Sequence, residues 1–536
     1  MKKIIACALS GGIDSFVASY LLKREGLHII GVFMKNWDVE EEQGVCSNKH
    51  DLYDVEKICN NLNIEFYQVN FVKEYWNNVF LPALDDYKQG YYTPNPDILC
   101  NSEIKFGCFL NYCINVLKVD AVATGHYASN SWDIKKVLSR QYDSNLHILE
   151  RPRLIAARDI IKDQTFFLSN ITEKALSKCI FPLSNLTKDN VRAIAKKTAL
   201  APLFSKKAES MGMCFVGKRT KFDQFLAQYY YDFHPVYDKY TGDKKINNQN
   251  NHTKSMTNMK DDTIFKDGDE NSINDFEFKI NEKYQAFEAK ETDCISSNFQ
   301  NNKPQMENDY ILKGDLSDKR EYYKTVLIDI DSNLQVGYMK YNRDLDNKES
   351  DQESTNFVTI GQRIERRRMI YANESKSRSC HTKQNKNVRY YVVRKDLAEN
   401  IIYVSSYWNH PSLYSTMFTT LAPHWINGSI ESYMTKPGIM DCFFRHVNIE
   451  GWFPCRVNID LSSPNVKLND YYDRLKNDTT PEHMLVELKY PSRAITPGQY
   501  AVFYKDSVCL GNARISRALP KAATYQNLTQ NLNNII

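Results

Sequence analysis

One stretch near the start of this 536-residue chain constrains its fold most strongly: Ala8-Leu9-Ser10-Gly11-Gly12-Ile13-Asp14-Ser15. An apolar run, Ile4–Leu9, leads into it, and an amphipathic run, Phe16–Arg24, follows and ends before Gly26. This order predicts a strand, a glycine-rich turn and a helix that Gly26 closes. It also predicts an anion cradle, because glycines let main-chain N–H groups approach a phosphate and the helix N-terminus offers unpaired donors.

The hydroxyl groups of Ser10 and Ser15 add further donors to this turn. The stretch has neither the lysine of a Walker A loop nor the three-glycine spacing of a dinucleotide fingerprint, so neither of those sites is expected. An ordinary tight turn between a strand and a helix is the alternative interpretation. The strand and helix signals on either side favour phosphate binding.

Length, charge and cysteine content limit the class of protein. A chain of 536 residues is too long for one hydrophobic core, so we expect two or three domains. Lys and Arg exceed Asp and Glu by 69 − 65 = 4, so any nucleic-acid site must be a local patch. The 13 cysteines include no Cys-x-x-Cys pair, which argues against a disulfide scaffold or zinc ribbon and indicates a reducing compartment.

The sequence shows no apolar run as long as a membrane span, so we expect no membrane partner. The first strand begins near Lys3, which leaves no room for a targeting peptide. As the sequence stands, we expect a cytoplasmic protein. A chain that had lost its first segment would look the same, and a mitochondrial or plastid location is then the alternative.

The N-terminal 200 residues alternate between strand and helix patterns. Further strands are expected at His28–Met34, Ile64–Val69 and Ala121–Thr124, and further helices at Leu52–Leu62, Tyr75–Tyr87 and Glu103–Leu117. This alternation predicts an α/β fold with a doubly wound parallel sheet, in which ligands bind at the carboxyl ends of the strands. Met34 ends the second strand and Gly125-His126 follows a later one, so both fall on that edge.

A loop between these strands, Tyr92–Asn101, is stiffened by Pro94 and Pro96. It carries Asp97 three residues before Cys100, which indicates a positioned site. A plain proline turn with a buried cysteine is the alternative, because free cysteines often serve as small core residues.

Composition divides the rest of the chain. Residues 242–319 are dominated by Asn, Asp, Lys and Ser and are expected to be a disordered insertion, as are 342–356 and 373–387. Alternating segments at Tyr323–Gly337 and Phe357–Arg363 predict a small β domain, and Tyr390–Ile515 predicts a compact β-barrel. The expected domains are residues 1–200, a central domain at 201–370 and a C-terminal barrel at 388–520. Thr187 is the expected N-cap of a helix within 185–200.

Several motifs occur together in one order along the chain. They are Ser10–Ser15, Phe33-Met-Lys-Asn-Trp37, Thr93-Pro-Asn-Pro-Asp-Ile-Leu-Cys-Asn101, Ala123-Thr-Gly-His-Tyr127, Lys162-Asp-Gln164, Gly212-Met-Cys-Phe215, Lys221–Leu226, Ile360–Arg363, Tyr391–Val393, Thr496–Gln499 and Ala501–Tyr504. The chain therefore resembles the bacterial and organellar tRNA-specific 2-thiouridylases of the N-type ATP pyrophosphatase superfamily. The resemblance spans most of the sequence outside the insertions.

The resemblance implies an ATP-dependent sulfurtransferase that makes 2-thiouridine at the tRNA wobble position. The implied cofactors are ATP and Mg²⁺, and the implied partners are tRNA and a persulfide donor protein, either a cysteine desulfurase or a relay. The family plan has an adenine nucleotide alpha hydrolase-like domain, a small central domain and a C-terminal barrel, with the RNA held between them.

Thiolation needs a leaving group on the carbonyl carbon and a sulfur nucleophile. A second thiol is then useful, because it forms a disulfide with the carrier cysteine when the sulfur departs. The resemblance assigns Cys214 as the persulfide carrier and Cys100 as the thiol that resolves it, and we expect a helix N-terminus or basic group near each. The other eleven cysteines are interpreted as inert. Asp97 either orients or deprotonates the attacking group, or caps the following helix.

The remaining expected site residues form two sets. Those for the nucleotide are Ala8, Leu9, Ser10, Gly11, Gly12, Ile13, Asp14, Ser15, Met34 against adenine, and Gly125, with Asp14 also expected to help place magnesium. Those for the substrate are Asn95, Pro96, Asp97, His126, Lys162, Asp163, Gln164 and Gln499. For His126, simple packing is the alternative to an RNA contact.

The sequence departs from the family pattern at two places. The glycine-rich run after Gly-Gln-Arg is here Ile364–Arg368, and the barrel's usual basic-aromatic RNA contact reads Cys442–Asn448. Arg366–Arg368 either contacts phosphates or is a solvated charged segment. Two other functions remain open. One is an adenylating enzyme that keeps the Ser10–Ser15 loop but has a small-molecule acceptor. The other, suggested by these departures, is a tRNA-binding protein that has lost catalysis.

Overall fold

A computed structural model of the chain describes residues 3–37, 47–147, 150–205, 225–226, 325–339, 358–364, 369–371, 388–428, 430–448, 451–459 and 483–519. The expected insertions at 242–319, 342–356 and 373–387 lie outside these described residues. So do Cys214, the Gly212–Phe215 motif and Arg366–Arg368, together with most of Lys221–Leu226.

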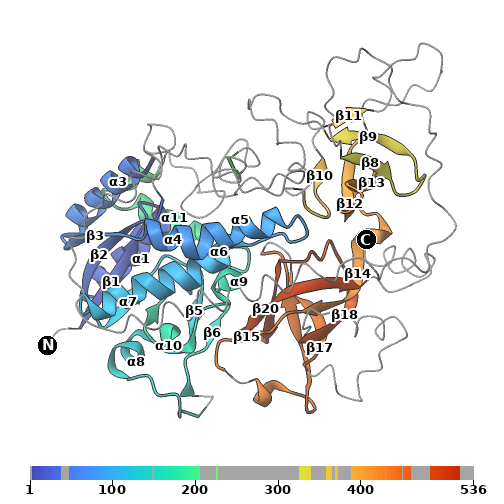
Figure 1. Cartoon of the computed structure of the whole chain (residues 1–536). Helices are drawn as coiled ribbons and strands as arrows, with labels where there is room; N and C mark the ends of the chain where they lie inside the picture. The colour runs from blue at the N-terminus through green and yellow to red at the C-terminus, as the bar shows by residue number, and fades with distance from the viewer. Residues whose placement is uncertain are drawn as a thin grey trace, which may run out of the picture. The chain divides into compact units, whose positions relative to one another are not determined.

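A five-stranded parallel sheet forms the core of the N-terminal part (Figure 1). Its order is β3-β2-β1-β4-β7, with bounds β1 (Ile4–Leu9), β2 (His28–Lys35), β3 (Phe66–Asn70), β4 (Ala121–Ala123) and β7 (Cys179–Ile180). The predicted α/β, doubly wound parallel sheet is confirmed. The strand order reverses direction between β1 and β4, which is where such sheets open a ligand crevice.

Helices join these strands much as the periodicity predicts. The principal ones are α1 (Ile13–Arg24), α3 (Ser47–Leu62), the continuous run α4 (Val72–Tyr75), η1 (Trp76–Phe80) and α5 (Leu81–Lys88), and a second run of α6 (Pro96–Leu99), η2 (Cys100–Phe109) and α7 (Leu110–Asn115). Shorter ones are α8 (Ile134–Ser139), α9 (Thr165–Leu168), α10 (Glu173–Leu176), α11 (Lys188–Lys196) and α12 (Ala201–Ser205).

Local signals set two of these helix ends. Gly26 adopts φ +79°, and the next N–H, of Leu27, donates to Leu22 O at 3.2 Å, so the left-handed residue ends α1 as expected. Thr187 caps α11 in a capping box with Asn190, which also confirms the expected N-cap.

The parallel sheet is buried on both faces, as shown by the successive residues Ile5 and Ala6 of β1, which point to opposite faces and are both 0% exposed. Phe16 and Val17 of α1 pack with Ile58 of α3 and Val191 of α11 in one apolar cluster. Ile5 belongs to a second cluster with residues such as Trp132 and Val137. Removing a fully buried side chain of this size costs about 2–5 kcal/mol, so these clusters hold the loops at the strand ends in place.

A second, six-stranded sheet follows in the order β10-β12-β13-β8-β9-β11. Its bounds are β8 (Val326–Asp329), β9 (Gln335–Met339), β10 (Arg363–Ile364), β11 (Met369–Tyr371), β12 (Tyr390–Asp396) and β13 (Ile401–Ser405). Strands β12 and β13, expected in the barrel from residue 388 onward, instead pair with β10 and β8. The reason is burial, because Val392, Ile402 and Val404 complete this sheet's apolar cluster.

The C-terminal strands close into a six-stranded antiparallel barrel, β14-β18-β17-β16-β19-β20, through pairing of β14 with β20. The bounds are β14 (Tyr414–Thr420), β16 (Ile439–Arg445), β17 (Phe453–Asn458), β18 (Met484–Arg493), β19 (Tyr500–Lys505) and β20 (Val508–Leu519). The short strand β15 (His424–Trp425) also pairs with β20. The predicted barrel is confirmed.

The barrel is tied to the N-terminal part by strand pairing. Strand β6 (Leu154–Ile155) pairs with Val508 and Cys509 of β20, and β5 (Ser129–Asn130) pairs with β6.

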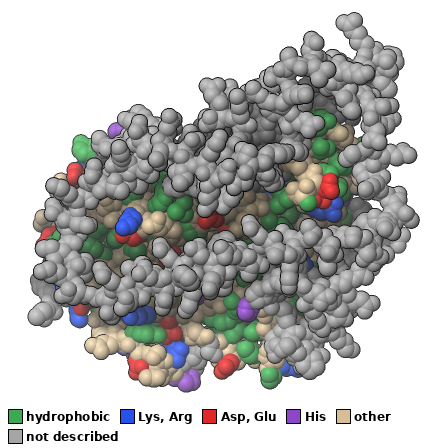
Figure 2. Space-filling model, in the orientation of Figure 1, with side chains coloured by type: hydrophobic (Ala, Val, Ile, Leu, Met, Phe, Trp, Pro, Cys, Tyr) green, Lys and Arg blue, Asp and Glu red, His purple; other side chains and the backbone are tan. Residues whose placement is uncertain are grey.

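Two surface properties bear on partners. No helix in the described part of the chain is long and apolar enough to span a membrane. On the face shown in Figure 2, Lys and Arg side chains of the described residues are interspersed with Asp and Glu.

Candidate active site

The loop after β1 has a backbone geometry that suits the expected anion cradle. Gly11 adopts φ +73°, whereas Gly12 has an ordinary φ of −85° and is the N-cap of α1. No side chain in the described part of the chain caps this helix, so its first N–H groups are available to a ligand. Ser15 Oγ donates to Gly12 O at 2.9 Å and lies 3.3 Å from Ser10 Oγ, so the two serines brace the turn.

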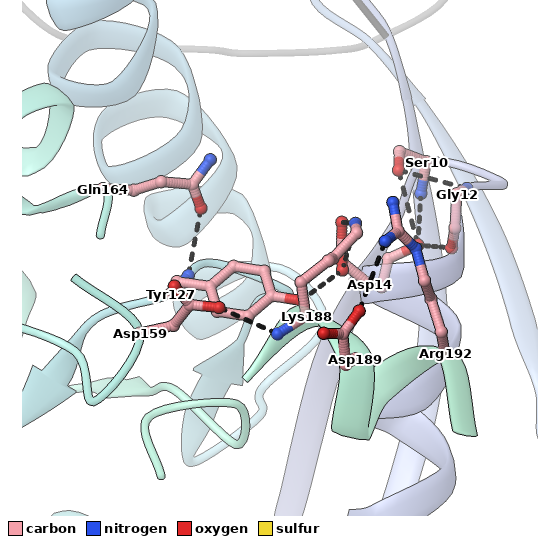
Figure 3. A network of polar contacts seen from close by, with 10 residues as sticks. Ser10, Gly12, Asp14, Tyr127, Asp159, Gln164, Lys188, Asp189 and Arg192 are labelled. Carbon is pink, nitrogen blue, oxygen red and sulfur yellow. Dashed lines mark hydrogen bonds and ion pairs between the residues drawn. The ribbon is translucent and has the colours of Figure 1, made fainter. Parts of the chain in front are cut away.

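Asp14 is engaged by two protein groups, which the sequence did not indicate (Figure 3). Lys188 Nζ donates to Oδ1 and Oδ2 of Asp14 at 2.9 and 2.8 Å, and Tyr127 Oη donates to Oδ1 at 2.8 Å. Lys188 is the first residue of α11, and its N–H donates to Asp159 Oδ2 at 2.9 Å. The cradle is thereby tied to α11 and to the segment that follows β4.

Gly125 brings the end of β4 against the cradle. A Cβ at this position would lie 2.7 Å from Asp14 C and from Ser15 N, so any larger residue would push the loop away. The next residue, His126, places Nδ1 2.8 Å from Thr124 Oγ1. Burial, with a smaller effect of Lys105, holds the pKa of His126 well below its usual value. The imidazole is therefore neutral near pH 7.

The end of β2 carries an unexpected polar group. Met34 is 7% exposed, and Asn36, two residues further on, is 1% exposed. Among the described residues, neither Asn36 Nδ2 nor Asn36 Oδ1 has a hydrogen-bond partner. Burying an amide without partners is costly, so this position fits a ligand that offers both a donor and an acceptor.

These groups fit ATP better than they fit a protein-bound magnesium ion. The uncapped start of α1 suits phosphates, and Asn36 suits the edge of a base. Both oxygens of Asp14, however, already accept from Lys188, and no group of three His, Cys, Asp or Glu in the described ranges could hold a metal. The expected role of Asp14 as a magnesium ligand does not fit this geometry, since the ammonium group occupies the ligand position.

The helix that starts at Pro96 carries the expected thiol. Asn95 is its N-cap, Asp97 lies in its first turn, and Cys100 begins η2 one turn further along. The cap position is thus taken by Asn95 and not by Asp97. Cys100 is fully buried, and the helix N-terminus expected near it lies one turn away. A phenylalanine of the same helix, Phe106, packs 5.8 Å from the His126 ring.

Two family models match the chain. One described as "tRNA methyl transferase HUP domain" matches residues 3–218, and one described as "Aminomethyltransferase beta-barrel domain" matches residues 474–515. The chain is 32% identical over 536 residues to mitochondrial tRNA-specific 2-thiouridylase 1 of Drosophila melanogaster, covering 99% of this chain and 100% of that protein. The chain belongs to the tRNA-specific 2-thiouridylase family.

Other members of the family are similar over different lengths. The Homo sapiens protein of the same name is 31% identical over 530 residues, covering 97% of this chain and 92% of that protein. The tRNA-specific 2-thiouridylase MnmA of Halalkalibacterium halodurans is 47% identical over 225 residues, which is 42% of this chain and 55% of that protein. As a member of the tRNA-specific 2-thiouridylase family, the chain is a sulfurtransferase, and the predicted resemblance is confirmed.

Among the positions matched to the 2-thiouridylase motifs, two expected substrate contacts also contact each other. Gln499 Nε2, between β18 and β19, donates to Thr93 O at 3.0 Å, and Asn95 Nδ2 lies 3.5 Å from Gln499 Oε1. Their amides are thus used within the protein, because the turn before β19 docks on the loop that leads to Cys100. Pro96 opens the helix at its first position.

The Lys162–Gln164 motif of this 2-thiouridylase is also used internally. Asp163 is 1% exposed, and its carboxylate accepts from Ala157 N–H, Thr165 Oγ1 and Arg445 Nη1. Asp163 is therefore a buried residue that holds these three groups together, and its carboxylate is not accessible to a substrate in this structure. Gln164 Oε1 accepts from Tyr127 N–H at 3.0 Å, which leaves Lys162 as the partly exposed cation of the motif.

The structure shows two pairs of an arginine and an aromatic ring that sequence reasoning missed. Arg445, in the segment compared with the family's RNA contact, is buried against Asp163 and cannot meet RNA. By contrast, Trp408 is 57% exposed with the Arg493 guanidinium 4.5 Å from its ring centre, and Arg394 lies 4.1 Å from the Tyr403 ring. A search of the folded chain for arginine side chains that lie beside exposed aromatic rings would find such pairs.

Proposed function

We propose that this protein is an ATP-dependent sulfurtransferase that adenylates and thiolates C2 of the wobble uridine of tRNA. One observation carries the proposal: the segment after β4 joins the anion cradle to the thiol helix. Gly125 packs against the Asp14–Ser15 backbone, and His126 packs against Phe106 of the helix that contains Cys100. The proposed nucleotide site and the helix of the resolving thiol Cys100 are therefore joined by the segment that follows the carboxyl end of β4.

The proposed reaction uses the groups at this edge in sequence. The cradle binds the ATP phosphates, and Asn36 binds the base edge next to Met34. Attack of the uridine O2 on the α-phosphate forms a C2–O–AMP bond and releases pyrophosphate. The terminal sulfur of a Cys214 persulfide then attacks C2 and AMP departs. Attack of Cys100 on the Cys214 sulfur releases 2-thiouridine and leaves a Cys100–Cys214 disulfide, which a cellular dithiol reduces.

Other side chains prepare this site. Asp97 faces the uridine as the acid-base or orienting group, and neutral His126 acts as a hydrogen-bonding group because its pKa is low. Lys162 contacts the tRNA backbone, and a persulfide donor protein loads Cys214. Because Lys188 Nζ donates to both oxygens of Asp14, Mg²⁺ would enter with ATP and would offset the charge of its phosphates. We infer a division into a nucleotide domain, a central sheet and a barrel, with β12 and β13 in the central part.

The names of two relatives place them in mitochondria, and we infer that this chain also acts on organellar tRNA. This inference replaces the cytoplasmic location expected from sequence. Depletion of the protein, followed by mass spectrometry of whole-cell and organellar tRNA, tests it. Loss of 2-thiouridine confined to organellar tRNA supports the inference, whereas loss confined to cytosolic tRNA contradicts it.

The function is tested with recombinant protein, ATP, magnesium, a persulfide donor and unmodified tRNA. Thiolated nucleoside should appear, and radiolabelled sulfur should separate the two thiols. Cys214→Ser should accept no sulfur, whereas Cys100→Ser should load sulfur but not complete turnover, because serine cannot resolve a persulfide. Failure to thiolate any tRNA refutes the proposal. Equal sulfur loading of wild type and Cys214→Ser refutes only the assignment of the carrier.

A further inference from the structure

The segment before the thiol helix, residues 86–95, is held by the C-terminal half of the chain. On the barrel, Arg514 Nη2 of β20 lies 2.5 Å from Asp86 Oδ1, and its guanidinium lies 4.6 Å from the Tyr92 ring centre. On the central sheet, Lys395 Nζ of β12 donates to Gly90 O. These contacts join parts of the sequence that lie hundreds of residues apart.

Four further hydrogen bonds join this segment to the turn of residues 496–499, which lies between β18 and β19. Thr93 N–H donates to Pro497 O at 2.9 Å, and Gln499 Nε2 donates to Thr93 O at 3.0 Å and to Pro94 O at 3.4 Å. The turn therefore satisfies both main-chain groups of Thr93. Asn95 completes the set through Gln499 Oε1.

The fit between turn and loop leaves no space for a larger residue. Gly498 has φ +86°, and a Cβ on it would lie 2.8 Å from both Thr93 N and Tyr92 Cβ. The turn thus approaches the backbone of the loop as closely as glycine allows. Hydrogen bonding through Gln499 and close contact through Gly498 are two independent features of the same interface.

The loop transmits this restraint to the thiol. Pro94 and Pro96 fix φ on either side of Asn95, so a fixed Thr93 leaves little freedom before the helix that begins at Pro96. Asp97 lies four residues after Thr93, and Cys100 lies seven residues after Thr93. A shift of the 496–499 turn would therefore move the start of the helix that carries both.

We propose that Gln499 is a positioning residue of the sulfur-transfer site, through which the barrel sets the position of Asp97 and Cys100. The part that concerns sulfur transfer rests on the proposed function. The role is indirect, since Gln499 acts on Thr93, Pro94 and Asn95 and touches no reacting atom. The barrel is then a component of the catalytic apparatus in addition to any contact with RNA.

The test compares Gln499→Ala, Gln499→Glu and Gly498→Ala with wild type and with Gln335→Ala, an exposed glutamine of β9 that serves as a matched control. Hydrogen exchange is measured on peptides covering residues 91–101, and iodoacetamide labelling is resolved cysteine by cysteine. In the three turn variants, exchange in this peptide and labelling of Cys100 should accelerate about tenfold or more, because local opening becomes easier. The control should behave as wild type.

Buried cysteines elsewhere report whether an effect is local. Cys113, Cys179 and Cys509 are all fully buried, and their labelling rates should not change. With tRNA as substrate, kcat for thiolation should fall about tenfold while KM for tRNA stays within about threefold, as expected when only positioning is lost. Sulfur loading of Cys214 should persist.

Two results would overturn the proposal. One is unchanged exchange and Cys100 labelling in Gln499→Ala and Gln499→Glu. The other is equal acceleration at all four cysteines, which would make the interface a contributor to global stability only. Failure of wild-type protein to thiolate tRNA would refute the proposed function instead, since exchange and labelling need no substrate and still report on the turn.

Discussion

Arg445 Nη1 on barrel strand β16 donates to Asp163 Oδ2 at 2.9 Å, and both side chains are 2% exposed. The ion pair joins the barrel to the Lys162–Gln164 motif after β4. Thr165 Oγ1 and Ala157 N–H donate to the same carboxylate, so the charge of Asp163 is well solvated by protein groups. A buried pair of this kind makes the motif's geometry depend on the barrel.

Breaking this pair should be strongly destabilising. In Arg445→Met, Asp163 remains buried without its cation, and the free energy of unfolding should fall by about 3–5 kcal/mol. Urea titration measures the change, and adding Asp163→Asn should restore part of it. Arg456→Met is the control, because the Arg456–Asp441 pair is 56% and 43% exposed and should contribute below about 1 kcal/mol. Equal losses in the two single variants would contradict a special role for the buried pair.

Gly125→Ala should weaken ATP binding without unfolding the protein. The added Cβ meets the Asp14 and Ser15 backbone at 2.7 Å, so the cradle must shift away from β4. Calorimetric titration with ATP should show an affinity at least about tenfold lower, a loss of roughly 1.4 kcal/mol. Gly451→Ala is the matched control, since a Cβ there meets no atom of the described residues within 4 Å. Unchanged affinity in Gly125→Ala would exclude the contact from nucleotide binding.

Asn36→Leu should raise stability and lower ATP affinity together. Replacing a buried amide that has no partners with an apolar group of similar size removes a desolvation cost, so the melting temperature without ATP should rise. The same change removes the proposed contact with the base, and ATP affinity should fall about tenfold or more, with a smaller preference for ATP over GTP. Retained affinity and preference would show that Asn36 does not bind the base.

The barrel should lose stability in mild acid because of His446. Burial lowers the pKa of His446 from 6.5 to about 4, and its Nε2 lies 2.9 Å from Ser492 Oγ. The unfolded chain therefore binds a proton between about pH 6.5 and 4 that the folded chain does not, so stability is full above pH 6.5 and falls as pH drops toward 4. The loss reaches about 3 kcal/mol. His446→Gln should flatten this dependence in urea titrations at pH 7, 6 and 5, and an unaltered slope would assign the effect to other groups.

Trp408→Ala should weaken tRNA binding. The indole is 57% exposed beside Arg493, and base stacking on such a side chain contributes about 1–3 kcal/mol. Filter binding should show at least about a fivefold loss of affinity, with ATP-dependent steps on bound tRNA unaffected. Val116→Ala is the control, because this side chain is 56% exposed on the nucleotide domain without an arginine on it in the described contacts. Equal affinity for wild type and Trp408→Ala would remove this surface from the RNA interface.

Local sequence determined the helices and strands of the N-terminal part that contains the parallel sheet. Runs of buried residues set β1 and β2, Gly26 ended α1, and the Thr187 hydroxyl began α11, because each depends on side chains only a few positions apart. The order of strand, glycines and helix also predicted the turn between β1 and α1. Motifs in a fixed order identified the family, which the identity over the full length confirmed.

Tertiary structure alone decided what the polar groups at the site contact. Gln499 and Asn95 look like substrate contacts in sequence, yet the folded chain pairs them across 404 positions. Asp163 finds Arg445 and Asp14 finds Lys188 in the same way. Such pairs follow from how sheets and barrel pack, and burial then requires each charge or amide to take a partner. The spacing of residues in the sequence does not predict these pairs, because they form only when the fold brings distant segments together.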